Sequence, residues 1–432
     1  MRFAIFEPEP RVCGPMSWAY HLRDGIRENG HECDVVTLTR SGKPRSVWGA
    51  GNMRPGIRWW GQSPDVVGRT SDAGDVLDQY DGVILSDART VMQDKEAAKD
   101  KAYLQPDVPD YLSALADTRT PFIFALHGNN YPPSEVPYVQ QLLELPNFLG
   151  RAVTHSPTSP DLSRHLWPDT AFTVSPLPYR MRTTPDDETL AGPSDAEHVG
   201  ITGRYITTKG HHALGMAAAL DLMPSADRVQ LWGASSLSLA ASATYKTFEA
   251  MVLGKPMTLP GVRHGVIKPG ERTETGGDVI RPYLWEVTAP GGTQVEYKGG
   301  YEDGFAACAN LNVHVDLTAS DFSDGMEYSQ FEAIDAGCMQ VSVKSMWSTD
   351  FTGRAVESVS SWPGEAKLVR QSAWREVLGE IGEAVEEVLT LDESQRRIVA
   401  RFNRTVLAAK HAPAVVARTF LTTMGVAPEE NT

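Results

Sequence analysis

Two short segments in the second half of the sequence carry residue types suited to binding a nucleotide. The first is Gly203-Arg204-Tyr205-Ile206-Thr207-Thr208-Lys209-Gly210, which follows a buried apolar run and opens a helical pattern. An Arg and a Lys five positions apart, with the N–H groups of a helix start, suit a diphosphate that gains negative charge as it leaves. A motif this short is, by spacing alone, more often a basic turn on the surface.

The second segment holds paired acids. It reads Asp324-Gly325-Met326-Glu327-Tyr328-Ser329-Gln330-Phe331-Glu332-Ala333 and is followed by Ala336-Gly337. Asp324 precedes the predicted helix, and Glu332 lies two turns on, where a carboxylate could accept hydrogen bonds from both hydroxyls of a ribose. Acidic residues also favour helix starts because of the helix dipole, so this pattern alone leaves a structural role equally open.

Alternating strand and helix patterns position both segments, which indicates an α/β fold with parallel sheets. The chain has 432 residues, too many for one ordinary core, and a polar, Pro-containing stretch at 179–196 separates two such series. Gly- and Pro-rich excursions from the sheets are predicted at 41–75 and 255–300. The predicted strands are Phe3–Phe6, Cys33–Leu38, Gly82–Ser86, Phe122–Leu126, Ala152–Thr154, Val199–Thr202, Val229–Trp232, Val313–Leu317 and Gln340–Val343. The predicted helices are 16–30, His211–Leu222, Tyr328–Ala336, Trp374–Leu389 and Glu393–Leu407.

Polar residues follow several strands of the first series. They are Ser86-Asp87, His127-Gly128-Asn129-Asn130 and His155-Ser156. Ligands of open α/β sheets bind at the carboxyl ends of strands, so these residues are candidates for a site. His127 is also consistent with a histidine that merely forms hydrogen bonds at a strand end.

Composition restricts the function classes. With 41% hydrophobic and 22% charged residues, the chain is expected to be globular, and its net charge of −15 argues against bulk coating of nucleic acid. A local exception runs from Arg40 to Gly61, which holds five cations, three tryptophans and no acid. Guanidinium groups there could pair with phosphates and Trp rings could stack on bases. Alternatively, the tryptophans pack on their own domain, as Trp usually does.

Other features indicate a protein of the cytoplasm. The first residues predict a buried strand and not a signal peptide, and no apolar run reaches the length of a membrane span. Four cysteines without metal-type spacing indicate reduced thiols. No metal or cofactor is expected.

The two motifs in combination resemble the retaining GT-B glycosyltransferases. By that resemblance, Arg204 and Lys209 bind the diphosphate of the donor and Glu332 binds its ribose, whereas Asp324 stands where the family usually has Glu. Further islands resemble the phage DNA α-glucosyltransferases within that family. These islands are Cys13-Gly14, Arg23-Asp24, Asn29-Gly30-His31-Glu32, 152–166, 326–332 and 336–338. Those enzymes carry a His-Asp pair near the acceptor; here His127 matches, but Gly128 replaces the Asp. Deprotonation of the acceptor would then rely on the donor phosphate and His127, or on another acid such as Asp87.

The resemblance implies a GT-B fold, with two Rossmann-like domains facing each other across a cleft. We expect an acceptor-binding domain over 1–180, a donor-binding domain over 190–395, and C-terminal helices over 396–432 that return to the first domain. The expected catalytic residues are Arg204, Lys209 and His127. The expected donor-binding residues are Gly14, Gly203, Gly233, Asp324, Gly325, Met326, Glu327 and Glu332. The expected acceptor-binding residues are Arg45, Arg54, Arg58, Trp59, Trp60 and Asn129.

The implied reaction transfers a hexose, expected to be glucose, from a UDP-sugar with retention of configuration. The acceptor would be the hydroxymethyl group of 5-hydroxymethylcytosine or 5-hydroxymethyluracil in double-stranded phage DNA, with no membrane partner. The expected location is then the host cytoplasm, if a phage encodes the chain. Two alternatives stay open. One is a GT-B enzyme acting on a glycolipid, a cell-wall precursor or a small metabolite, which the acidic charge and Gly128 favour. The other is a protein that binds a nucleotide sugar without turnover.

Overall fold

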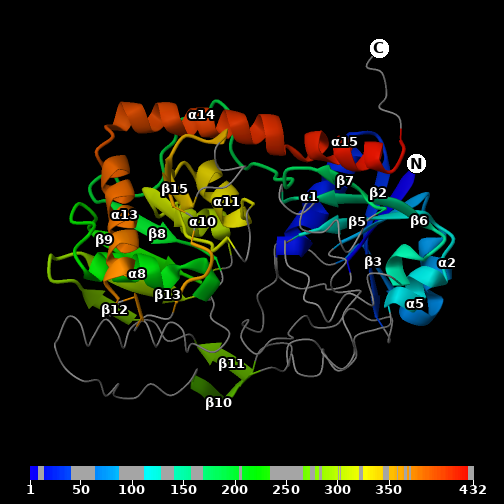
Figure 1. Cartoon of the computed structure of the whole chain (residues 1–432), viewed down its shortest axis with the longest axis horizontal. Coiled ribbons are helices and arrows are strands. Elements are labelled where there is room, and N and C mark those ends of the chain that lie inside the picture. The colour runs from blue at the N-terminus through cyan, green and yellow to red at the C-terminus, as the bar shows by residue number, and fades with distance from the viewer. Residues whose placement is uncertain are drawn as a thin grey trace.

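The computed structural model of the chain contains two α/β domains, with the C-terminal helices running across the top from one to the other (Figure 1). The described residues are 1–7, 14–39, 64–86, 111–127, 141–156, 169–203, 207–233, 266–272, 278–281, 285–299, 301, 303–320, 325–343, 350–357, 359–363, 367–368 and 371–426.

The first domain is built on a parallel sheet of seven strands in the order β3-β2-β1-β4-β5-β6-β7. Its strands are β1 (Arg2–Phe6), β2 (Glu32–Thr39), β3 (Val66–Arg69), β4 (Gly82–Leu85), β5 (Phe122–Leu126), β6 (Phe148–Thr154) and β7 (Ala171–Val174). Its helices are α1 (Gly14–Glu28), α2 (Ala73–Leu77) and α5 (Tyr111–Ala116). All four residues of β4 and all five of β5 are buried, as expected of central strands covered on both faces.

The predicted opening of this domain is confirmed. Strand β1, helix α1 and strand β2 form a β-α-β unit, and α1 is followed by Gly30 at φ +82°, a left-handed conformation that suits Gly. The prediction that 41–75 is an excursion is wrong for its last part, because β3 pairs with β2 at the edge of the sheet.

The second domain has a sheet in the order β12-β13-β9-β8-β14-β15-β16, parallel except for the β12–β13 pair. Its strands are β8 (His198–Ile201), β9 (Arg228–Trp232), β12 (Trp285–Thr288), β13 (Gln294–Gly299), β14 (Val313–Asp316), β15 (Met339–Val343) and β16 (Arg354–Val356). A separate antiparallel pair consists of β10 (Val266–Arg272) and β11 (Asp278–Arg281). The second domain also holds the short turn η3 (Thr207–Lys209) and the helices α8 (His211–Ala219), α10 (Gly304–Cys308) and α11 (Tyr328–Ala336).

The predicted excursion at 255–300 needs a correction. Strands β12 and β13 lie within it, and β13 pairs with β9, so this part of the segment extends the sheet. Val295 and Tyr297 of β13 are buried. The Gly291-Gly292 turn allows the hairpin, with Gly292 at φ +107°.

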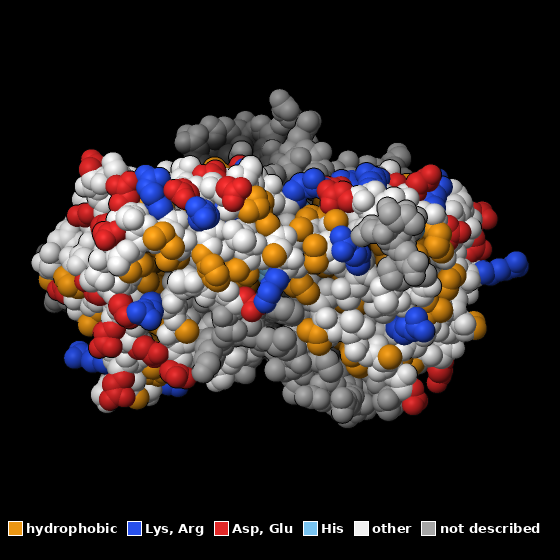
Figure 2. Space-filling model, turned by 90° about the horizontal axis from the view of Figure 1, so that it is seen from above, with side chains coloured by type: hydrophobic (Ala, Val, Ile, Leu, Met, Phe, Trp, Pro, Cys, Tyr) orange, Lys and Arg blue, Asp and Glu red, His pale blue; other side chains and the backbone are white. Residues whose placement is uncertain are grey.

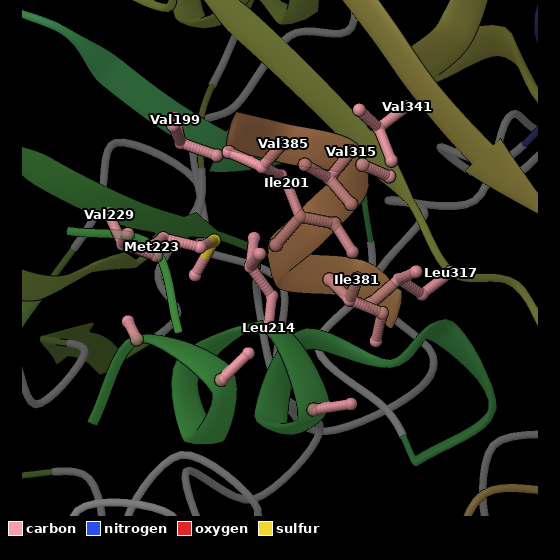
Figure 3. Packing of buried hydrophobic residues seen from close by; sticks show 14 of the residues in the cluster. Val199, Ile201, Leu214, Met223, Val229, Val315, Leu317, Val341, Ile381 and Val385 are labelled. Carbon is pink, nitrogen blue, oxygen red and sulfur yellow. The ribbon is translucent and has the colours of Figure 1, made fainter. Parts of the chain in front are cut away.

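The core of the second domain lies between its sheet and the helices α8 and α13 (Ser372–Leu389). Leu214 of α8 and Ile381 and Val385 of α13 pack with residues of the strands, among them Ile201 and Val315 (Figure 3). All five side chains are buried. Each such side chain contributes roughly 1.5–3 kcal/mol on leaving water, so the two helices hold β8 and β14 firmly in place.

The last two helices, α14 (Glu393–His411) and α15 (Pro413–Thr423), return to the first domain as predicted. Helix α15 packs on α1 closely, since a Cβ added to Gly25 would lie 2.0 Å from the carbonyl oxygen of Pro413. The amide of Asn29 donates to the carbonyl of Ala414 at 2.9 Å, and the rings of Trp18 and Phe420 meet edge-on. The limits of the three predicted regions remain predictions.

Candidate functional site

Lys209 lies at the carboxyl edge of the second sheet, where the turn η3 packs closely against the end of β14. Gly210 has φ +71°, and a Cβ there would lie 2.5 Å from Cβ of Leu317. Only Gly fits this contact, which brings η3 against the end of β14. Lys209 is 8% exposed, and its Nζ lies 3.4 Å from Oγ1 of Thr318 and 2.6 Å from Oε1 of Glu327.

Thr318 is itself held in place. Its N–H and its hydroxyl both donate to Oδ1 of Asp316, at 2.9 and 2.6 Å. Its hydroxyl oxygen therefore faces Lys209 as an acceptor, and the ammonium has an oxygen partner on the sheet as well as one on α11.

Glu327 is the N-cap residue of α11. Its side chain and that of Gln330 form a capping box, in which each accepts from the backbone N–H of the other. The first N–H groups of α11 thus point toward the same region as the ammonium of Lys209, and an anion placed there would meet positive charge from both. Met326, directly before Glu327, is buried.

The structure brings several predicted donor-binding residues to this edge. Gly203 follows β8 at φ +135°, and Gly233 follows β9, where its N–H donates to the carbonyl of Gly299 at 2.8 Å. Gly325, Met326 and Glu327 lead into α11. Asp324 of this group, and Arg204 of the expected catalytic residues, lie outside the described residues.

Glu332 lies further along α11, beside α10. Removal of its carboxyl from water raises its pKa to about 8, and the nearby Asp303 carboxylate adds to the rise while Arg182 opposes it. Arg182 is engaged by Asp303 at 2.7 Å. A Cβ on Gly304 would overlap Oε2 of Glu332, so this Gly makes room for the carboxyl. Near neutral pH the group is mostly protonated and can both donate and accept a hydrogen bond.

A second polar group lies at the carboxyl edge of the first sheet. Nε2 of His127, after β5, is 3.3 Å from Oγ of Ser86, after β4. The hydroxyl of Ser86 donates to Oε2 of Glu7, after β1, at 2.5 Å. His127 is stacked on the ring of His155 at 5.4 Å and meets the ring of Trp18 edge-on at 4.6 Å. Glu7 and Ser86 are buried.

Sequence reasoning missed Glu7 as a site residue and treated Ser86 only as a polar strand end. Both follow buried strands directly, which is the signal that singled out His127. Gly14, predicted in the donor site, begins α1 near the same edge. The predicted acceptor residues Arg45, Arg54, Arg58, Trp59, Trp60 and Asn129 lie outside the described residues.

The two edges meet through α1 and α11. The ring of His21 on α1 is stacked on the ring of Tyr328, the first residue of α11, at 5.6 Å. The hydroxyl of Tyr328 donates to the carbonyl of Pro178, and that of Tyr179 donates to Oδ2 of Asp335. The start of α11, which carries Glu327, is therefore anchored against the first domain.

Within the described ranges, no group of three or more His, Cys, Asp or Glu residues is placed to hold a metal ion. The helices of those ranges also include none of the length and apolar character that crossing a bilayer would need.

Comparison with known proteins gives a match in structure. No protein-family model and no curated protein matches the sequence. HepE of Anabaena, solved with UDP and glucose, is 11% identical at a TM-score of 0.57, with 99% of this chain and 100% of that chain covered. An alpha-glucosyltransferase solved with UDP and a 13-mer DNA containing a HMU base is 13% identical at a TM-score of 0.55, covering 98% and 99%. A glycosyltransferase of Rickettsia africae is 11% identical at a TM-score of 0.56, covering 100% and 99%.

These neighbours are GT-B glycosyltransferases, and they match along the full length of both domains. The chain therefore has the GT-B fold, in which two Rossmann-like domains are followed by C-terminal helices. The fold predicted from the two motifs is confirmed. At 11–13% identity the likeness concerns the fold, and the activity has to be argued from the site.

Proposed function

We propose that the chain is a hexosyltransferase that moves a sugar, expected to be glucose, from a UDP-sugar to a hydroxymethylated pyrimidine in DNA. One observation carries this proposal: the buried ammonium of Lys209 lies beside the N-terminus of α11 at the carboxyl edge of the second sheet. In open α/β sheets that edge is where ligands bind.

The arrangement suits a leaving diphosphate. In the absence of donor, Glu327 neutralises Lys209 at 2.6 Å. A diphosphate carries more negative charge than one carboxylate, so it competes for the same ammonium and for the N–H groups of α11. Charge grows on the diphosphate as the glycosidic bond breaks, which strengthens these contacts toward the transition state. HepE and the alpha-glucosyltransferase were both solved with UDP, which is consistent with a uridine nucleotide.

The choice of DNA as acceptor rests on the sequence islands and on the neighbour solved with DNA containing a HMU base. A hydroxymethyl group on a paired pyrimidine has to leave the base stack to enter a site between domains, which costs a few kcal/mol. Acidic and basic side chains are interspersed on the face that α14 and α15 cover (Figure 2). Among the described residues of that face, no broad basic surface is visible. The proposed DNA contact rests on the sequence pattern of Arg40 to Gly61, a stretch that lies outside the described residues.

A second candidate acceptor is a glycolipid, a cell-wall precursor or a small metabolite. The net charge of −15 favours it, because an acidic chain repels DNA at long range. The replacement of the carboxylate after His127 by Gly128 also departs from the DNA-modifying pattern.

The deciding experiment incubates the chain with UDP-glucose and other UDP-sugars, with DNA containing 5-hydroxymethylcytosine or 5-hydroxymethyluracil, and reads nucleosides by mass spectrometry. Glycosylated nucleoside is the expected result. Sugar transfer to a lipid or a free sugar, with none to either DNA, would favour the second candidate. If DNA is the acceptor, replacing Arg54 and Arg58 by Ala should lower transfer to long DNA and flatten its salt dependence, while UDP-glucose hydrolysis in water stays unchanged.

A further inference from the structure

We infer that Glu327 is a counter-ion that the diphosphate of the donor displaces from Lys209, and that its return to Lys209 promotes the release of UDP after sugar transfer. This inference rests on the proposed function, because it takes the surroundings of Lys209 as the diphosphate site. The sequence predicts Glu327 among the donor-binding residues. The inference gives its carboxylate the opposite effect, since the negative charge weakens the binding of UDP.

The ammonium of Lys209 needs negative charge nearby when no donor is bound. Its side chain is 10% exposed, and Oε1 of Glu327 lies 2.6 Å from its Nζ. A charge that is held out of water without compensation destabilises the folded state. Thr318, at 3.4 Å, offers Lys209 a neutral oxygen, because its hydroxyl proton is donated to Asp316. Of these two contacts, the one with Glu327 provides the compensating charge.

Glu327 also stands at the positive end of a helix. It is the N-cap residue of α11, and its N–H donates to Oε1 of Gln330 at 3.0 Å. Ser, Thr, Asp and Asn are the residues preferred at an N-cap, so capping alone does not account for Glu at this position. Its longer side chain reaches Lys209. One carboxylate thus lies beside both sources of positive charge that a diphosphate would use, the ammonium and the start of α11.

Sugar transfer makes the bound nucleotide more negative. The terminal phosphate is esterified in the UDP-sugar, whereas in UDP it is free and carries additional charge near neutral pH. Like charges at short distance repel each other, so Glu327 opposes the product more strongly than the substrate. As UDP leaves, the ion pair with Lys209 forms again and the ammonium is not left bare. Glu327 therefore favours product release, a step that limits the turnover of many enzymes.

Titration calorimetry on the wild type and Glu327→Gln tests the effect on affinity. The variant keeps the size of the side chain and loses its charge. We expect it to bind UDP about tenfold more tightly and the UDP-sugar about threefold more tightly. Uridine, which has no phosphate, should bind equally to both chains, a result that a general change in the shape of the site would not give. Asp392→Asn is the matched control, because Asp392 forms the same kind of capping box with Gln395 at the start of α14.

A double-mutant cycle tests whether Glu327 acts through Lys209. When Lys209→Gln is made first, UDP and Glu327 no longer compete for an ammonium. Glu327→Gln should then tighten UDP binding by only about twofold, which is the part due to direct repulsion. An equal tenfold gain in both backgrounds would overturn the role of Glu327 as a counter-ion of Lys209.

Steady-state kinetics tests the effect on product release. In Glu327→Gln the inhibition constant of UDP should fall about tenfold, and kcat should fall about threefold as release becomes slower. Rapid-mixing experiments should then show a burst of transferred sugar before the steady state. A loss of kcat of about 100-fold with unchanged affinity for UDP would place Glu327 in the transition state and overturn the inference.

The outcomes separate this inference from the proposed function. No binding of UDP by the folded wild-type chain would count against the proposed function. Binding of UDP with equal strength by the wild type and Glu327→Gln would overturn the inference alone. If Glu327→Gln does not fold, Glu327→Ser removes the same charge and places a preferred N-cap residue at the start of α11, and the same gain in affinity for UDP is expected of it.

Discussion

Replacing Glu332 by Gln tests the most strongly shifted carboxyl group of the donor side. In the folded chain the pKa of Glu332 is raised from 4.5 to about 8, chiefly because the carboxyl leaves water. Folding therefore favours its neutral form. The stability that this neutral form provides is fully present below pH 4.5 and is lost as the pH rises through 8. Gln is neutral at every pH, so the variant lacks this dependence.

The size of the effect follows from proton linkage. At 1.36 kcal/mol per pKa unit, the free energy of unfolding of the wild type falls by about 2 kcal/mol between pH 6 and pH 8, relative to that of Glu332→Gln. The fall is about 1 kcal/mol if solvent that reaches the half-buried side chain screens the shift. Urea unfolding of both chains at pH 6, 7 and 8 measures the difference. Glu376→Gln, on the exposed side of α13, serves as the control for loss of a charge. Parallel curves for the wild type and Glu332→Gln would refute the assigned burial of this carboxyl.

Three further predictions concern the donor site and the C-terminal helices. Lys209→Ala should lower kcat by roughly 100-fold, on the order of 3 kcal/mol, and change KM for the UDP-sugar less, as steady-state kinetics would show. Arg404→Met should destabilise the fold by about 3–5 kcal/mol in urea unfolding, because the buried guanidinium donates to the carbonyls of Asp335, Asp187 and Thr189; a loss below 1 kcal/mol would contradict this. Gly25→Ala should speed hydrogen exchange in α15, because the added Cβ would collide with Pro413. The control Gly379→Ala, whose added Cβ meets open space, should raise the free energy of unfolding by up to about 1 kcal/mol.

Much of the fold follows from the sequence because central strands of a parallel sheet are continuous apolar runs. Gly82–Leu85 and Phe122–Leu126 are buried throughout, and their pattern identified them. The edge strands gave no such signal. Val66–Arg69 is half-buried or exposed along its length, and β13 follows a Gly-rich turn that resembles a loop. Their pairing depends on the neighbouring strands, which local composition does not reveal.

The sequence predicted individual residues of the candidate site, but it did not predict which of them contact each other. The sequence singled out Lys209 and Glu327 separately, but their ion pair depends on Gly210 approaching the end of β14. Glu7 and Ser86 are 79 positions apart and meet only because β1 and β4 are adjacent in the sheet. A strand order of this kind is decided by the packing of the whole domain, so the link from Glu7 to His127 needed the structure.

The packing of α15 on α1 has a consequence for how the chain reaches its native state during translation. Asn29 and Ala414, joined by a hydrogen bond, are 385 positions apart. The core that contains Trp18 also contains Phe420. The first domain therefore lacks helix α15, which covers part of its core, until almost all of the chain has been made. The apolar surface around α1 stays exposed through the synthesis of the entire second domain. A chaperone that binds this surface would therefore stay bound longest to the N-terminal part of the protein.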